Sequence, residues 1–115
     1  MDELYQPTYD FLVRIARSGE ITTYGDVAKE IGLVSNNRGH LSRIFKILDQ
    51  INEQQAAGGR PLLSIVVVNK SKRIPGPGFF ENARYLRRFD GSTPEERADF
   101  FQQELRRTHD YWKNR

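Results

Sequence analysis

The spacing of apolar residues predicts three helices in the first half of the chain. In segments 8–17 and 24–31, apolar side chains repeat at intervals of three and four residues, and Thr23 is suited to cap the second segment. A longer helix is predicted from residue 38 to about residue 55, with an apolar stripe made of Leu41, Ile44, Phe45, Leu48 and Ile51. Its opposite face carries Gly39, Arg43, Lys46 and Gln50.

The second half of the chain alternates between a strand pattern and helix signals. Residues 62–68 are aliphatic and largely β-branched, which predicts a buried strand, and residues 21–23 predict a shorter one. A basic turn at 70–73 and a loop rich in proline and glycine at 74–78 follow the longer strand. Helices are predicted over 81–88 and from a capping box at Thr93 to about Trp112.

This order of elements predicts an α+β fold that is mainly helical. We expect residues 1–115 to form a single domain. Residues 8–75 would form a winged-helix-like core of three helices with a short strand and a wing, and residues 76–115 a loop and a C-terminal helical extension. In a winged helix, the third helix enters a groove of the DNA, so this order favours a nucleic-acid partner.

Composition excludes several classes of function. Cysteine is absent and His40 and His109 are the only histidines, which excludes disulfides, thiolate zinc sites, cysteine nucleophiles and histidine-rich metal sites. We therefore expect no metal and no cofactor. No segment approaches the roughly 20 apolar residues of a membrane span, and the acidic start lacks the pattern of a signal peptide. A cytoplasmic location without a membrane partner is expected.

Charge is distributed unevenly along the chain. The formal net charge is +3, but residues 38–88 contain ten Lys or Arg against three Asp or Glu, a balance of +7. A basic central block favours a polyanion, and duplex DNA in particular, as partner. The alternative is a solvated surface that happens to be rich in lysine and arginine.

Two segments resemble a known family. The segment GEITTYGDVA at residues 19–28 resembles the opening of the DNA-binding domain of alkylguanine-DNA alkyltransferases and alkyltransferase-like proteins. The segment HLSRIF at residues 40–45 resembles the part of that family's recognition helix that carries an intercalating arginine. The resemblance implies that Tyr24 lies against the DNA backbone beside a flipped nucleotide and that Arg43 enters the base stack.

The catalytic motif of that family is missing. When Val67-Val68-Asn69 is aligned with the family's Val-Val turn, Ser64 stands where the family has its cysteine, and the following histidine and arginine are absent too. A serine hydroxyl without a neighbouring base is a poor nucleophile, so alkyl transfer is not expected. The sequence thus favours a non-enzymatic DNA-binding protein, a catalytically inactive alkyltransferase-like reader of DNA.

The residues expected at the DNA fall on the predicted second and third helices and on the wing. They are Tyr24, Asn37, Arg38, Gly39, Arg43, Lys46, Lys70, Lys72 and Arg73. One alternative is a protein-interaction module that uses the loop at 75–80 and the C-terminal helix, in which case Arg43 would pair with an acidic residue such as Glu96 or Asp99. Another is an enzyme that uses Ser64 or His40, for which no motif is found.

Overall fold

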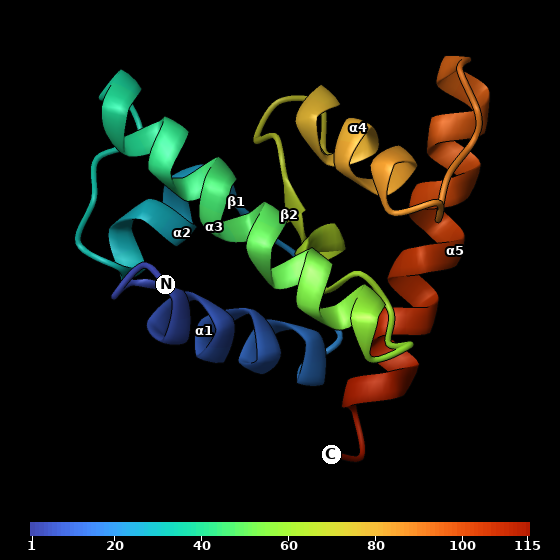
Figure 1. Cartoon of the computed structure of the whole chain (residues 1–115), viewed down its shortest axis with the longest axis horizontal. Helices are drawn as coiled ribbons and strands as arrows, with labels where there is room; N and C mark the ends of the chain where they lie inside the picture. Colours follow the sequence, from blue (N-terminus) through green and yellow to red (C-terminus); the bar gives the residue numbers. More distant parts are fainter.

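Five α-helices, a 3₁₀ helix and two short strands make up the fold, and the computed structural model describes all 115 residues (Figure 1). Their bounds are α1 Tyr5–Arg17, β1 Thr22–Thr23, α2 Tyr24–Glu30, α3 Arg38–Ala57, η1 Leu63–Val66, β2 Val67–Val68, α4 Pro77–Tyr85 and α5 Pro94–Trp112. The fold is thus mainly helical with a small sheet, which confirms the coarse expectation of an α+β protein.

Capping side chains set where three of the helices begin. The Thr23 hydroxyl accepts a hydrogen bond from the Asp26 amide at the start of α2, and the Asn37 side chain accepts one from the His40 amide at the start of α3. The predicted capping box of α5 is present in full, because Thr93 and Glu96 bond to one another's backbone amides. These local signals explain why the starts of α2, α3 and α5 were predictable.

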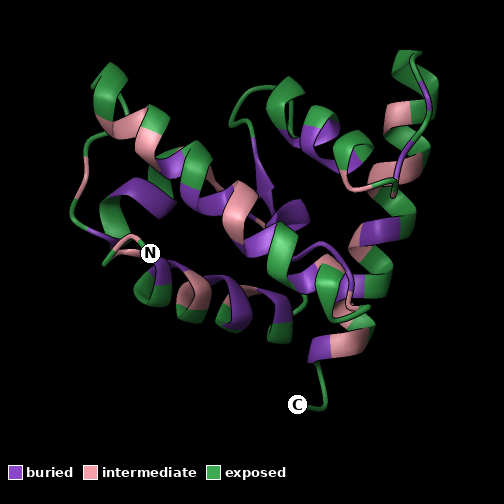
Figure 2. Cartoon of the chain, viewed as in Figure 1, coloured by how far each residue is buried: buried purple, intermediate pink, exposed green.

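The core lies between α1, α3 and α5, with η1 buried in its middle (Figure 2). The buried residues of α3 include Ile44, Ile47, Leu48 and Ile51. The predicted apolar stripe was therefore wrong at Phe45, which is 43% exposed, and it omitted Ile47. Phe45 stays near the surface because its ring packs edge-to-face on Tyr24 instead of entering the core.

The predicted strand at 62–68 is mostly not a strand. Residues Leu63–Val66 form a 3₁₀ turn and only Val67–Val68 pair in a sheet, although every residue from 62 to 68 is buried. Side chains take the place of a neighbouring strand. The side-chain oxygen Oδ1 of Asn52 accepts a hydrogen bond from the Ser64 backbone amide at 3.0 Å. The Glu104 carboxylate accepts one from the Leu62 backbone amide at 2.8 Å. The apolar run therefore predicted burial correctly and backbone geometry incorrectly.

The two strands pair in parallel, with Thr22 opposite Val67 and Thr23 opposite Val68. The basic turn after β2 is closed by a 2.9 Å hydrogen bond from the Asn69 amide to the Ile74 carbonyl oxygen, and no strand follows it. The expected wing is therefore a loop between β2 and α4 and not the tip of a β-hairpin. Residues 69–76 are called the β2–α4 loop below.

The C-terminal part completes the core instead of extending from it. α4 begins at Pro77, inside the expected loop and four residues before the predicted start at 81, so that Phe79 and Phe80 are buried helical residues. α5 packs against α1 and η1, and Trp112 is buried beside Tyr9. No helix is long and apolar enough to cross a membrane.

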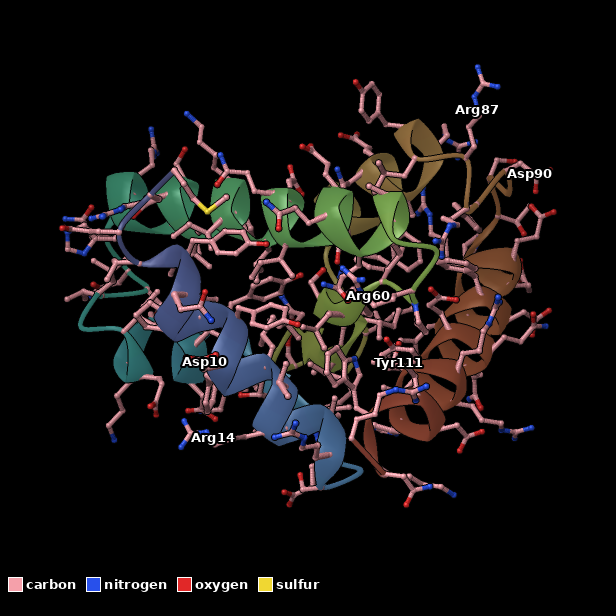
Figure 3. The ribbon with its side chains drawn as sticks, turned by 60° about the horizontal axis from the view of Figure 1, so that its bottom comes forward. Asp10, Arg14, Arg60, Arg87, Asp90 and Tyr111 are labelled. Carbon is pink, nitrogen blue, oxygen red and sulfur yellow. The ribbon has the colours of Figure 1, made fainter.

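The outer face of α1 is polar. Figure 3 shows Asp10 and Arg14 on this helix pointing away from the core, and Arg14 forms a 3.1 Å ion pair with Glu30 at the end of α2. α1 also begins three residues earlier than predicted, at Tyr5, which is buried. The lower left of the molecule in Figure 1 is therefore formed by a helix with mixed surface charge.

Candidate nucleic-acid interface

Tyr24 joins the start of α2 to the β2–α4 loop. Its hydroxyl oxygen accepts a hydrogen bond from the Gly76 amide at 2.9 Å, and its ring lies 5.4 Å from that of Phe45 in an edge-to-face contact. Burial raises the pKa of the Tyr24 hydroxyl, an effect that the Gly76 amide opposes. A Cβ at position 76 would lie 3.4 Å from the Tyr24 oxygen, so glycine allows the loop to approach this closely.

A small cavity of about 100 Å³ lies beside Tyr24, between α3, η1 and the first turn of α4. Tyr24, Phe45 and Phe79 supply aromatic walls, and Asp49 and Ser64 supply the polar groups. This is the place where the family resemblance puts its active site, because Ser64 stands at the position of the missing cysteine. The structure therefore brings Tyr24 and Ser64, which are far apart in the sequence, to one cavity.

No base is hydrogen-bonded to Ser64, although Asp49 lines the same cavity. Its hydroxyl oxygen accepts from the Asn52 side-chain amide at 2.7 Å, and the Asn52 carbonyl oxygen accepts from the Ser64 backbone amide. No histidine lines the cavity. His40, in the first turn of α3, instead accepts a hydrogen bond from the Val34 amide, and His109 on α5 contacts the Glu20 carbonyl oxygen.

Asp49 is the functional candidate that the sequence analysis missed. It lines the cavity, and burial raises its pKa to about 6, with smaller contributions from Glu53 and Glu81. Asp49 and Glu53 are one helical turn apart on α3, which the sequence does show, but Glu81 comes from α4. The Asp49 carboxyl group therefore changes between hydrogen-bond donor and acceptor close to neutral pH.

Five of the predicted DNA-binding residues are exposed cations that form no ion pair. They are Arg38 and Lys46 on α3 and Lys70, Lys72 and Arg73 on the β2–α4 loop. The start of α3 and the β2–α4 loop both lie at the upper edge of the molecule in Figure 1. Unpaired cations on these two elements are free to neutralise phosphates.

Asn37 and Gly39 lie at the same end of α3 and are exposed. The Asn37 side-chain oxygen is occupied as the cap of α3, which leaves its amide nitrogen as the group that can donate to a ligand. Gly39 presents backbone without a side chain at the first turn of α3.

Arg43 is not free, in contrast to the five cations above. It donates two hydrogen bonds of 2.7 Å to the Asp2 carboxylate, and Glu3 lies 3.8 Å away. This contact lowers the pKa of Asp2 to about 2 and raises that of Arg43. The alternative pairing with Glu96 or Asp99 was wrong, since Glu96 bonds to the amides of Ser92 and Thr93 instead.

The large aromatic side chains of the surface expected for an interaction module are buried, although most of α5 is exposed. Phe79, Phe80 and Trp112 are each less than 10% exposed, so their side chains are not available to a partner. Large exposed apolar residues lie elsewhere, at Val34, Phe45 and Tyr85, the last with 78% of its surface exposed.

No group of three or more histidine or acidic residues is arranged to hold a metal ion. No family model, curated protein or solved structure matches the chain.

Proposed function

We propose that this protein is a non-enzymatic DNA-binding protein of winged-helix-like organisation, which contacts duplex DNA with α3 and the β2–α4 loop. The observation that carries the proposal is the set of five unpaired cations on these two elements, both of which also contact Tyr24, through Phe45 and Gly76. Because none of the five side chains is neutralised by an acidic residue, each can displace a counterion from the DNA backbone.

The cavity supports a reader of DNA over an enzyme. Its aromatic walls suit a flat apolar ring, and Asp49 and Ser64 offer hydrogen bonds to the edge of such a ring. The family resemblance implies the same use, namely a nucleotide held beside Tyr24. A reaction at Ser64 would require a base to deprotonate the hydroxyl, and the Asn52 amide that contacts it is not one.

A salt titration tests this function. Duplex DNA binding should weaken linearly on a double-logarithmic plot of affinity against salt, with a slope of about −0.9 per neutralised phosphate. The variant Arg38→Ala/Lys46→Ala should reduce both the affinity and the slope. Its control is Arg17→Ala/Arg106→Ala, which removes two exposed and unpaired cations from the end of α1 and from α5.

The two variants have the same net charge, so a difference between them measures position and not total charge. Equal losses of affinity in the two variants would mean that binding depends only on total charge, which would contradict the proposed interface. Absence of binding at low salt would refute the function altogether and favour a protein partner.

A further inference from the structure

A second cavity, of about 270 Å³, lies where the β2–α4 loop meets the first turns of α4 and α5. Three prolines, Pro75, Pro77 and Pro94, form rigid parts of its wall. Two cationic side chains, Lys72 and Arg97, also line it, and no aspartate or glutamate does. The remaining lining residues are Asn69, Ile74, Gly76 and Phe80. We call it the Lys72–Arg97 cavity.

The two cations of this cavity lack partners within the protein. Neither Lys72 nor Arg97 forms an ion pair. The guanidinium of Arg97 lies over the Phe80 ring at 5.8 Å, and its Nε–H is buried without a hydrogen-bond acceptor. A buried donor without an acceptor is unfavourable, and a bound anion would supply the missing acceptor.

The start of α4 adds a second favourable feature. Gly76 and Pro77 line the cavity and form the N-cap and first residue of this nine-residue helix, which has no side-chain cap and no acidic residue in its first turn. The positive end of the helix dipole is therefore not compensated there. The start of α5 differs, because its capping box already satisfies it.

We propose that the Lys72–Arg97 cavity binds a phosphate group. The guanidinium of Arg97 and the ammonium of Lys72 would donate charge-assisted hydrogen bonds to its oxygens, and the rigid proline walls would limit the size of the ligand. Two sources can supply this chemistry. A DNA backbone phosphate adjacent to Lys70 and Arg73 would extend the proposed interface, whereas a free phosphate or phosphate monoester would make this site independent of DNA.

The Arg97 Nε–H group itself reports on the site by NMR. Titration of inorganic phosphate against chloride at constant ionic strength should shift the Arg97 Nε–H resonance in a saturable way. The exposed Arg106 should shift little and without saturation, and it is the internal control. Equal, non-saturating shifts of both resonances, or no shift of Arg97, would overturn the proposal.

Variants then identify the source. Lys72→Gln should weaken phosphate binding by about tenfold, since it removes one charged donor and keeps Arg97 as the reporter. Arg97→Lys retains the charge and loses the Nε donor, so binding followed at the Gly76 and Gly78 amides should also weaken. A melting curve of each variant excludes unfolding as the cause.

The same variants are then compared with Arg106→Gln in duplex DNA binding. Lys72 belongs to the proposed DNA interface whatever the cavity binds, so Arg97→Lys decides the source. A greater loss of DNA affinity in Arg97→Lys than in Arg106→Gln identifies the DNA backbone. Unchanged DNA affinity in Arg97→Lys together with weakened phosphate binding identifies a free phosphate. The second result would stand even if the protein bound no DNA, so failure of the proposed function is distinguishable from failure of the cavity.

Discussion

Arg43 on α3 and Asp2 near the N-terminus are joined by two parallel hydrogen bonds, from Nε and Nη2 of the guanidinium to the two carboxylate oxygens. Such a bidentate contact fixes the plane and direction of the arginine side chain. The residue that the family resemblance places in the base stack is therefore held by the first residues of the chain. DNA has to compete with Asp2 for it.

The first prediction follows from this competition. Asp2→Asn should increase the affinity for duplex DNA, because it releases the Arg43 guanidinium and removes a negative charge. Arg43→Ala should reduce affinity by about fivefold or more relative to the wild type. The double variant Asp2→Asn/Arg43→Ala should bind about as weakly as Arg43→Ala, because Asp2 then has no arginine to restrain. Fluorescence anisotropy at one salt concentration measures all three variants. Glu95→Gln, which removes an exposed carboxylate on α5, controls for the change in net charge.

If Asp2→Asn behaves like Glu95→Gln, the ion pair does not restrain a DNA-binding residue. If Arg43→Ala lowers the melting temperature and leaves DNA affinity intact, Arg43 serves only to fasten the N-terminus. The stability from this pair should be present above about pH 4 and be lost as pH falls toward 2, because the pKa of Asp2 is lowered to about 2 in the folded protein.

The second prediction concerns the β2–α4 loop. The triple variant Lys70→Ala/Lys72→Ala/Arg73→Ala should weaken binding to all duplex sequences by the same factor, because exposed cations on a loop contact phosphates and carry no base readout. Competition assays with unrelated duplexes of equal length measure this. A loss confined to one sequence would show that the loop reads bases.

The third prediction is that the protein does not accept alkyl groups. Ser64 is hydrogen-bonded on both its hydroxyl and its backbone amide by Asn52, and no base is in contact with it. After incubation with DNA that contains an alkylated guanine, the intact mass of the protein should be unchanged. A stoichiometric mass increase that maps to Ser64 would show that the cavity activates the hydroxyl.

The fourth prediction uses the raised pKa of Asp49, which is about 6 in the folded protein. Protonated Asp49 stabilises the fold relative to the ionised form, so this contribution is present below about pH 4 and lost as pH rises through 6. Asp49→Asn should therefore raise the melting temperature near pH 7.5 and have little effect near pH 4. Asp90→Asn, at the solvent-facing position labelled in Figure 3, should show no such pH-dependent gain.

The fifth prediction tests how α5 is held. Glu104 is only 1% exposed and accepts a hydrogen bond from the Leu62 amide, with Arg88 and Arg107 within 3.7 Å of its carboxylate. Glu104→Ala should destabilise the protein by about 1–3 kcal/mol, because it leaves a buried amide without an acceptor. Glu104→Gln keeps an acceptor and should cost less. Urea denaturation of both variants measures the difference, and equal losses would mean that shape and not hydrogen bonding matters.

Local signals in the sequence predicted much of the fold. Thr23, Asn37 and the Thr93 capping box set helix starts through contacts within three residues, which a sequence displays directly. The backbone of 62–68 could not be predicted in the same way. Its backbone amides donate to Asn52 and Glu104, which are polar side chains on two helices. A β-branched run does not predict such partners.

The candidate site was predictable in its charges and not in its cavities. Arg38 and Lys46 on α3 and the three cations of the β2–α4 loop are exposed as their polar positions suggested, whereas Arg43 is partly buried against Asp2. The cavity at Tyr24, by contrast, depends on α4 starting at Pro77, so that Gly78 and Phe79 reach Asp49. The pairing of Arg43 with Asp2 spans all of α1 and α2, a separation of 41 residues over which spacing rules carry no information.

The parallel pairing of Thr22 with Val67 also limits how early β1 can form its sheet during synthesis, because the two residues are far apart in the sequence. β1 leaves the ribosome long before its only partner strand, and α1 does so long before η1, which fills the core beneath it. Contacts between such distant segments form slowly because a long loop must first close. The core beneath the N-terminal helices is therefore incomplete until η1 and the Glu104 carboxylate that binds the Leu62 amide are in place.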